Sequence, residues 1–171
     1  MPRAPRPRGS HVSDNKAIIE NLNEVLTAEL TAINQYFLHS ELCEYWGYGA
    51  LHAKIRAEAI DEMRHAEQII ERILYLEGLP NVQRLGKIKI GENVAEALAA
   101  DRDLEREAIP RLNAGIELCR TSGDNGTRAL LEGILRNEED HLDWIDTQIA
   151  LIERVGEQNY LAAQIHPSGQ G

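Results

Sequence analysis

Apolar residues recur at helical spacing through most of the 171-residue chain. Steps of three and four residues place them on one side of a helix. Glycine- or proline-containing stretches separate the segments that carry this pattern. We therefore predict long helices over Asp14–Trp46, Leu51–Glu77, Glu92–Arg120 and Thr127–Val155, and a short fifth helix over Glu157–Ile165.

The first predicted helix has two apolar stripes instead of one. The first stripe contains Leu22, Val25, Ala32 and Tyr36, with Glu29 among them, and the second contains Leu26, Leu30, Ile33, Asn34 and Phe37. A helix that is apolar on two sides must bury both of them. One stripe is therefore expected to face its own bundle and the other a neighbouring subunit.

The connections between the helices predict how they are arranged. Gly47–Gly49 and Thr121–Gly126 are short turns, which favour two antiparallel hairpins. Residues 78–91 form a longer link that reaches about 46 Å when extended, enough to return along the bundle. These lengths predict an all-α four-helix bundle in which one long crossover joins the two hairpins. Pro110 should kink the third helix without ending it.

Composition and charge exclude several classes of protein. The formal net charge is −10, which disfavours nucleic acid as a partner because phosphate binding needs a basic face. No apolar run is long enough to span a membrane, and no apolar segment follows the basic start to make a secretory signal. We interpret residues 1–12 as a leader or tag, 13–165 as the bundle domain and 166–171 as a tail. Cys43 and Cys119 are expected to be small buried thiols in a reducing cytosol.

A repeated Glu-x-x-His motif provides the strongest chemical signal. Each copy places a carboxylate and an imidazole on one helix face, and another Glu lies 33 residues before each motif. In each predicted hairpin, that Glu and the motif are equally far from the turn, so they should lie at the same height. The two sets are Glu29 with Glu62 and His65, and Glu105 with Glu138 and His141.

This ligand set predicts a dinuclear metal site in the bundle core. One Glu or one His on an apolar stripe is more often structural, but four buried carboxylates at one level require compensating positive charge. Arg102 is the one basic side chain that lies within a turn of a proposed Glu ligand and near its helical phase, so bound cations must supply the rest of the positive charge. Carboxylates with imidazoles suit iron or manganese, and zinc can compete. Glu62 and Glu138 would bridge two metals, with Glu29, Glu105, His65 and His141 as terminal ligands.

Three further residues near the motifs have more than one interpretation. Tyr36 is either a hydrogen-bonding or redox neighbour of the metals or a core tyrosine, and Trp144 is more typical of packing. Met63 directly follows a proposed ligand, and it points about 100° away from the inner face. Generic helix packing favours a surface methionine there. The apolar stripe of the first helix would also suit a flat cofactor at a subunit interface, with the thioether as an axial ligand of haem iron.

The stretches AELTAINQYFLH, AIDEMRHAEQIIERILYLEGLPN and LRNEEDHLDWIDTQIALI resemble those of the bacterioferritin family, the haem-containing ferritins, across residues 13–165. The resemblance implies a ferritin-like fold and a cytoplasmic twenty-four-subunit shell (24-mer) built from dimers. It implies a ferroxidase that uses dioxygen or hydrogen peroxide to oxidise Fe(II), with two irons per subunit. By position, the ferroxidase ligands would be Glu29, Glu62, His65, Glu105, Glu138 and His141.

The same resemblance implies one haem b per subunit dimer, with Met63 from two subunits as axial ligands. Its surroundings would be Leu30, Ile33, Asn34, Phe37 and Ile60, and haem would assist electron transfer from a small redox partner during iron release. One position departs from the pattern of some members: Ala57 stands where they carry a histidine for an inner-surface iron site, although Asp61 remains. The short fifth helix would pack at a symmetry axis of the shell.

Two other functions are compatible with the motifs alone. A dinuclear-iron oxygenase or reductase would share the ligands, although the chain has no second domain for an organic substrate and no Cys-x-x-Cys segment. A non-enzymatic shell that binds haem or buffers cations would share the architecture. The number of irons taken up per subunit would separate these hypotheses.

Overall fold

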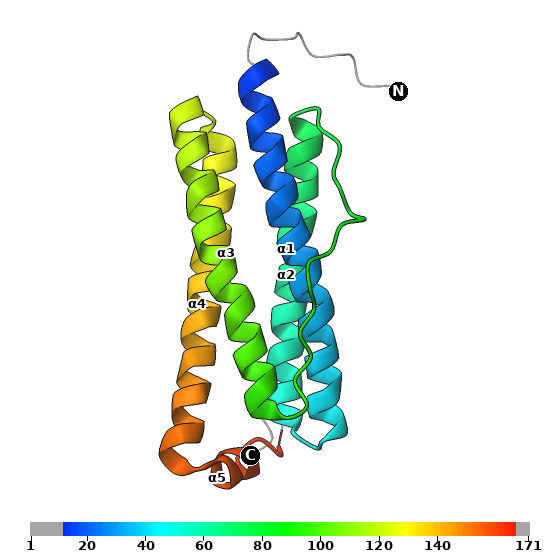
Figure 1. The fold of residues 1–171 in the computed structure, drawn as a ribbon, viewed down its shortest axis with the longest axis vertical. Helices are drawn as coiled ribbons and strands as arrows, with labels where there is room; N and C mark the ends of the chain where they lie inside the picture. Colours follow the sequence, from blue (N-terminus) through cyan, green and yellow to red (C-terminus); the bar gives the residue numbers. More distant parts are fainter. Residues whose placement is uncertain (1–11, 167–171) are drawn as a thin grey trace.

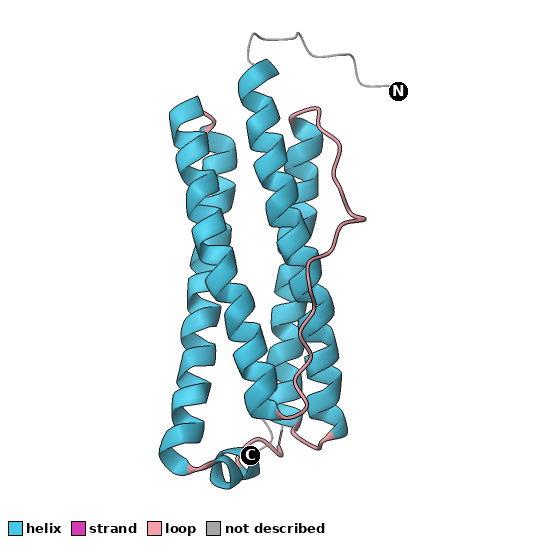
Figure 2. Ribbon diagram, in the orientation of Figure 1, coloured by secondary structure: helices cyan, strands magenta, loops and turns pink. Residues whose placement is uncertain are grey.

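The structure is a computed structural model that describes residues 12–166, and its secondary structure over this range is helical (Figures 1 and 2). Residues 1–11 of the predicted leader and 167–171 of the predicted tail lie outside the described residues. The helices are α1 (Val12–Tyr45), α2 (Gly49–Tyr75), α3 (Val94–Ser122), α4 (Asn125–Val155) and α5 (Glu157–Ala162).

The predicted topology is confirmed. The helices α1 and α2 form one antiparallel hairpin, and α3 and α4 form the other (Figure 1). The crossover, residues 76–93, runs along the outside of α1, so that α2 and α3 are parallel. In the bundle α1 also packs against α3, and α2 lies beside α4.

The observed helix ends differ from the predicted ends by up to three residues, and capping explains the shifts in α3 and α4. The Asn93 side chain accepts a hydrogen bond from the Glu96 N–H, so α3 begins at Val94. Asp124 caps α4 in the same way through the Thr127 N–H, which places the helix start inside the predicted turn. The helix α3 continues through Pro110, as expected.

The hydrophobic core is divided into two clusters along the bundle. One cluster is formed by residues such as Leu22, Leu26, Ile69, Leu112 and Leu131. The other is formed by residues such as Leu51, Ile55, Leu98, Ile145 and Tyr160. On every long helix, the residues between the two clusters include buried carboxylates, and α2 and α4 add a buried histidine each. The polar layer therefore lies inside the bundle, between two apolar layers.

A row of polar residues on α1 fixes the crossover, and the sequence patterns considered above do not predict it. The row recurs every fourth residue and therefore lies on one face of the helix. Its members are Asn23, Thr27, Thr31, Gln35 and His39, and each makes a hydrogen bond to the crossover.

Backbone groups of the crossover make several of these hydrogen bonds. The Gly86 N–H donates to Thr31 Oγ1 (2.8 Å). The Lys89 N–H donates to Gln35 Oε1 (2.9 Å). An extended segment without a sheet partner needs such acceptors for its backbone N–H groups. The α1 row supplies them, which explains how 18 irregular residues (76–93) follow one path along the bundle.

A buried hydrogen-bond network holds the end of the crossover next to α3. The Gly91 N–H donates to His39 Nε2 (3.1 Å), so the proton of His39 lies on Nδ1, which faces Asp101 Oδ1 at 2.7 Å. Gln35 Nε2 donates to the same oxygen at 2.8 Å. All three side chains are buried. Asp101 therefore joins α3, α1 and the crossover through a single carboxylate.

Replacing Asp101 by Ala is expected to lower the free energy of unfolding by about 2–4 kcal/mol, because the two buried donors on α1 lose their acceptor. Thermal unfolding of the metal-free protein measures the change. Asp103→Ala is the matched control on the same helix, since Asp103 pairs with Lys89 at a half-exposed position (3.2 Å). An equal loss in both variants would contradict the role of Asp101.

The short helix α5 closes the end of the bundle near the α1–α2 turn (Figure 1). Its Tyr160 is buried, and the hydroxyl donates to Gln148 on α4 (3.0 Å). The Ala50 N–H at the start of α2 donates to the Gln164 carbonyl (3.0 Å). Among the described helices, none combines the length and apolar character that a membrane crossing requires.

Candidate metal centre

The six proposed metal ligands all lie in the polar layer, and all are buried. Each long helix contributes to the cluster, because the two hairpins bring equidistant residues to the same height. The contributions are Glu29 from α1, Glu62 and His65 from α2, Glu105 from α3, and Glu138 and His141 from α4. The structure therefore brings together every residue of the predicted set.

His65 lies at the centre of one half of the cluster. Its Nδ1 atom is 3.1 Å from Glu138 Oε1. The same nitrogen is 3.4 Å from an oxygen of Glu29 and 3.4 Å from an oxygen of Glu62. One ring nitrogen thus faces carboxylates from three helices.

His141 and Glu105 form the other half. His141 Nδ1 is 2.8 Å from Glu105 Oε1, and the Tyr36 hydroxyl donates to that same oxygen. The Tyr36 ring packs edge-on against the His141 ring, with centroids 5.3 Å apart. The Trp144 ring stacks against the His141 ring, with centroids 6.3 Å apart. Tyr36 therefore contacts the cluster through a polar atom, as one of its two interpretations required, whereas Trp144 contacts it through ring packing, as expected.

Two groups of ligand atoms lie close enough to share a metal ion each. In each group, the candidate ligand atoms are all within 4.8 Å of one another. Glu62 belongs to both groups, as a carboxylate shared by two metals would, whereas Glu138, the other proposed bridge, belongs only to the first. The first group contains Glu29, Glu62, His65 and Glu138, and the second contains Glu62, Glu105 and His141.

Burial and mutual repulsion change the acid–base properties of the cluster. Burial raises the pKa of Glu62 and of Glu138 well above the usual value, and neighbouring carboxylates raise them further. Burial alone would lower the pKa of His65, but the carboxylates around it raise that pKa to about 12. Without bound cations, the cluster therefore keeps protons that a surface cluster would lose.

Some carboxylate oxygens in the cluster lack partners. Glu105 Oε2 is buried and accepts no hydrogen bond, and Glu29 Oε2 has only the ion-pair contact with His65. Arg102, the one basic residue expected nearby, instead lies 3.6 Å from Asp146. Oxygen atoms with free lone pairs, together with two imidazoles and no thiolate, are donors that suit iron or manganese. The residues therefore fit a dinuclear metal centre.

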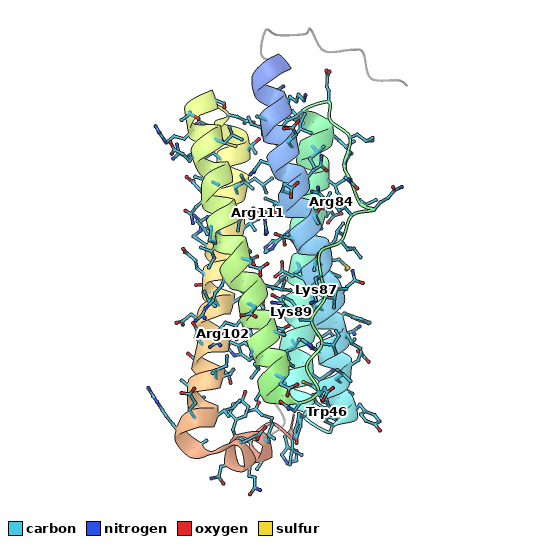
Figure 3. All side chains as sticks on the ribbon, in the orientation of Figure 1. Trp46, Arg84, Lys87, Lys89, Arg102 and Arg111 are labelled. Carbon is cyan, nitrogen blue, oxygen red and sulfur yellow. The ribbon has the colours of Figure 1, made fainter. Side chains whose placement is uncertain are left out.

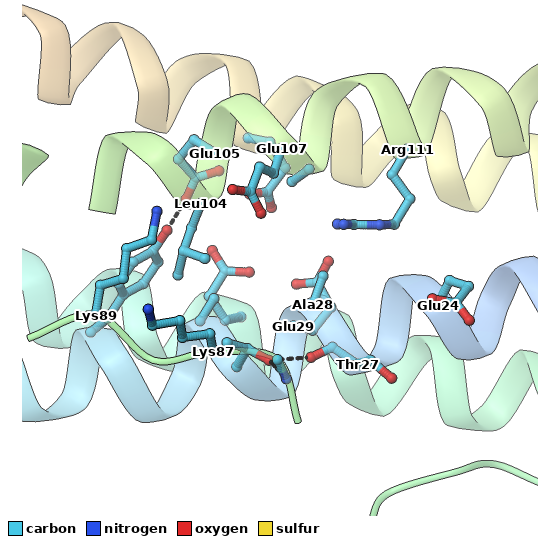
Figure 4. Close-up of a pocket in the computed structure, with 17 residues that line it drawn as sticks. Glu24, Thr27, Ala28, Glu29, Lys87, Lys89, Leu104, Glu105, Glu107 and Arg111 are labelled. Atoms are coloured by element: carbon cyan, nitrogen blue, oxygen red, sulfur yellow. Dashed lines mark hydrogen bonds between the residues drawn. The ribbon is translucent and has the colours of Figure 1, made fainter. Parts of the chain in front are cut away.

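A cavity of about 310 Å³ reaches the cluster between α1, α3 and the crossover (Figure 4). All four carboxylates of the cluster line it. Lys87 and Lys89 enter its wall from the crossover and Arg111 enters from α3 (Figures 3 and 4). Small molecules thus have a route from the crossover side of the bundle to the cluster.

A second cavity of about 230 Å³ reaches the cluster between α2 and α4, the opposite side of the bundle. It is lined by both histidines and by further acidic residues, among them Glu58, Asp61 and Asp140. The two cavities share only Glu62 and Glu138. The cluster is therefore reached from both sides of the bundle, and a further cavity of about 520 Å³ between α2 and α4 is also lined by His65.

Sequence reasoning missed two residues that contact the cluster. Glu58 Oε2 is 3.8 Å from His141 Nδ1, and Asn137 Nδ2 is 3.0 Å from His65 Nε2. The signal for Glu58 was its position one helical turn before Glu62. Asn137 directly precedes Glu138 and offered no pattern. Ala57, the departure noted above, is exposed, and Asp61 pairs with Arg64 on its own helix (2.6 Å).

The residues proposed to surround a haem come from both helices of the α1–α2 hairpin: Leu30, Ile33, Asn34 and Phe37 from α1, and Ile60 and Met63 from α2. Met63 is 55% exposed, Phe37 49% and Ile60 38%. Asn34 is exposed, and Leu30 and Ile33 are half-buried. This surface is separate from the polar layer, as the predicted rotation of Met63 requires.

Comparison with known proteins identifies the class that this fold and site define. Residues 19–155 match the family model for the ferritin-like domain. Bacterioferritin from Streptomyces coelicolor is 51% identical over 159 residues, covering 90% of this chain and 95% of that protein. Bacterioferritin BfrA from Mycobacterium tuberculosis is 49% identical over 145 residues (85% and 91%), and bacterioferritin from Brucella melitensis is 42% identical over 143 residues (84% and 89%). The chain belongs to the bacterioferritin family.

Proposed function

We propose that this protein is a cytoplasmic iron store that oxidises Fe(II) to Fe(III) and keeps the ferric product in a hollow shell of twenty-four subunits built from dimers. The convergence of four buried glutamates and two histidines from four helices is the observation that carries the proposal. Membership in the bacterioferritin family supports iron as the cargo and a multimeric shell as the assembly. The net charge of −10 suits a protein that collects cations.

Each part of the cluster has a role in the proposed reaction. Two Fe(II) substrate ions held side by side can supply two electrons to one molecule of dioxygen or hydrogen peroxide. Glu62 and Glu138 would be shared between the two ions, and Glu29, Glu105, His65 and His141 would each hold one of them. The carboxylates neutralise charge, which favours the ferric product over the ferrous substrate.

We also propose that haem b binds at the interface of a subunit dimer, with Met63 from each subunit as an axial ligand. The exposed apolar surface around Met63 supports this, because burying it against a second subunit removes it from water. Leu30, Ile33, Asn34, Phe37 and Ile60 would line the haem. Haem held there would assist electron transfer from a small redox partner during iron release.

Aerobic addition of Fe(II) to the assembled, iron-free protein tests the storage function. We expect fast ferric absorbance and uptake of far more than two irons per subunit, measured with size-exclusion chromatography to report the assembly. An oxygenase or reductase acting on an organic substrate would saturate near two irons. A non-enzymatic shell would show no oxidation faster than buffer, and either result would reject the proposal.

The raised pKa values of Glu62, Glu138 and His65 predict how metal binding responds to pH. Their protons must leave when a metal binds, so protons compete with the metal as the pH falls. The same retained protons stabilise the metal-free fold at low pH. This stabilisation begins to be lost as the pH rises above the ordinary pKa of each group, which is 4.5 for the two carboxyls and 6.5 for His65. The increase in Tm caused by saturating Zn(II) should therefore be larger at pH 8 than at pH 6. A constant increase would contradict the assignment.

A further inference from the structure

Asn137 is the one residue outside the proposed ligand set that contacts the second nitrogen of a proposed ligand histidine in the described structure. It lies on α4, directly before Glu138, and its side-chain amide spans the gap between α4 and α2. The amide nitrogen Nδ2 is 3.0 Å from His65 Nε2, while His65 Nδ1 faces the carboxylates. Both nitrogens of the His65 imidazole therefore have a polar contact: Nδ1 with the carboxylates and Nε2 with the Asn137 amide.

The tautomer of His65 decides whether it can bind a metal. When Nδ1 carries a proton, it donates a hydrogen bond to the carboxylates and has no free lone pair. A metal can bind Nδ1 only after that proton has left. When Nδ1 binds a metal, the proton of the neutral ring lies on Nε2 and needs an acceptor there. Among the hydrogen bonds of the described residues, the side chain that contacts Nε2 is the exposed Asn137 amide.

An amide can serve both forms of the ring. Its NH2 group donates to Nε2 when that nitrogen carries no proton, and Nδ2 lies 3.0 Å from Nε2. Rotation of the amide by 180° presents the oxygen instead, and the oxygen accepts from an Nε2–H. A carboxylate at this position would serve only the metal-binding tautomer, and an aliphatic side chain would serve neither.

The second histidine lacks this support. Among the hydrogen bonds of the described residues, none involves His141 Nε2, although its Nδ1 atom contacts Glu105. The two halves of the cluster therefore differ in how their histidines are oriented. A change at Asn137 should affect the half that contains His65 and leave the other half largely unchanged.

We propose that Asn137 is a positioning residue, which orients the His65 ring and accepts a hydrogen bond from Nε2–H when Nδ1 binds a metal, and so sets the affinity of one of the two metal positions. The inference rests on the proposed metal centre. It concerns binding rather than turnover, so it can be tested without iron oxidation. The acidic ligands and the core residues stay unchanged in the test.

Titration of the assembled, iron-free protein with Co(II), followed by visible absorption and calorimetry, provides the test. Asn137→Leu is expected to weaken one of the two Co(II) sites per subunit about tenfold, the usual effect of losing a group that orients a ligand. Asn137→Asp should retain or increase the wild-type affinity, because it supplies the acceptor. Asn113→Leu is the matched control, since Asn113 is exposed on α3 and bonds only within its own helix.

Each outcome of the titration decides between the alternatives. Wild-type affinity at both sites in Asn137→Leu would overturn the inference and leave the proposed function intact. An equal loss of Co(II) affinity in Asn137→Leu and Asn137→Asp would also overturn the inference. In that case, altered packing rather than the loss of a hydrogen-bond acceptor would explain the effect. Wild-type protein that binds no Co(II) would overturn the metal centre itself. Wild-type protein that binds two Co(II) without oxidising Fe(II) would reject only the proposed ferroxidase.

Discussion

Replacing both Glu138 and His141 by Ala is expected to slow the aerobic oxidation of Fe(II) on the order of 100-fold or more. The change removes a ligand from each of the two groups that could hold a metal. The variant can then no longer hold two Fe(II) ions side by side, so the two ions cannot deliver two electrons together to one oxidant. Stopped-flow absorbance of ferric products, recorded with two Fe(II) per subunit, measures the initial rate.

The same variant should remain folded. Burial and neighbouring carboxylates already raise the pKa of Glu138 well above its usual value, so its removal relieves a repulsive site in the metal-free protein. Glu139→Ala with Asp143→Ala is the matched double control, since both residues are exposed on the same helix. Unchanged oxidation in the ligand variant, with wild-type assembly, would reject the site.

The positions of the ligands could be predicted because two independent regularities agreed. Helical spacing placed Glu62 with His65 on one face, and equal distances from a turn placed Glu29 beside them. Neither regularity depends on tertiary detail, so errors of two or three residues at helix ends did not disturb the match. The crossover could be predicted from the length of the link between α2 and α3. A link of that length is needed only if α2 and α3 are parallel, because the chain must then return along the whole bundle.

The path of the crossover could not be predicted in the same way. The α1 row from Asn23 to His39 has helical spacing, but polar residues on a helix usually face solvent. Only the structure shows that the row accepts hydrogen bonds from an extended segment more than 50 residues away in sequence. Glu58 and Asn137 were missed for a related reason: each contacts a histidine of the cluster through geometry that a single helix pattern does not contain.

Two surfaces of the α1–α2 hairpin now have different physical explanations. The inner surface holds four buried carboxylates, whose charge must be neutralised by retained protons in the metal-free protein or by bound cations. The outer surface, around Met63, holds large apolar side chains that are exposed in a single subunit. Because the two surfaces share no residue, changes on one should leave the chemistry of the other largely intact.

Replacing Met63 by Leu is expected to abolish the Soret absorption of haem while leaving the assembly intact. Leucine keeps the size and apolar character of methionine, so the contact between subunits should persist. It lacks the thioether sulfur, which is the only proposed protein ligand of the haem iron. Visible spectra of purified shells after haem reconstitution, with size-exclusion chromatography for the assembly, provide the measurement.

Two further variants make the Met63 result specific. Met63→His restores a ligand atom and should restore a Soret band at a shifted wavelength, because imidazole replaces thioether on the iron. Ile60→Leu alters the same surface without touching the ligand and should bind haem as the wild type does. Haem retained by Met63→Leu with an unchanged spectrum would exclude Met63 as the ligand, whereas loss of haem in all three variants would assign the effect to packing at the dimer interface. Iron oxidation should remain at the wild-type rate in Met63→Leu, since the 55% exposed side chain lies outside the polar layer that contains the metal ligands.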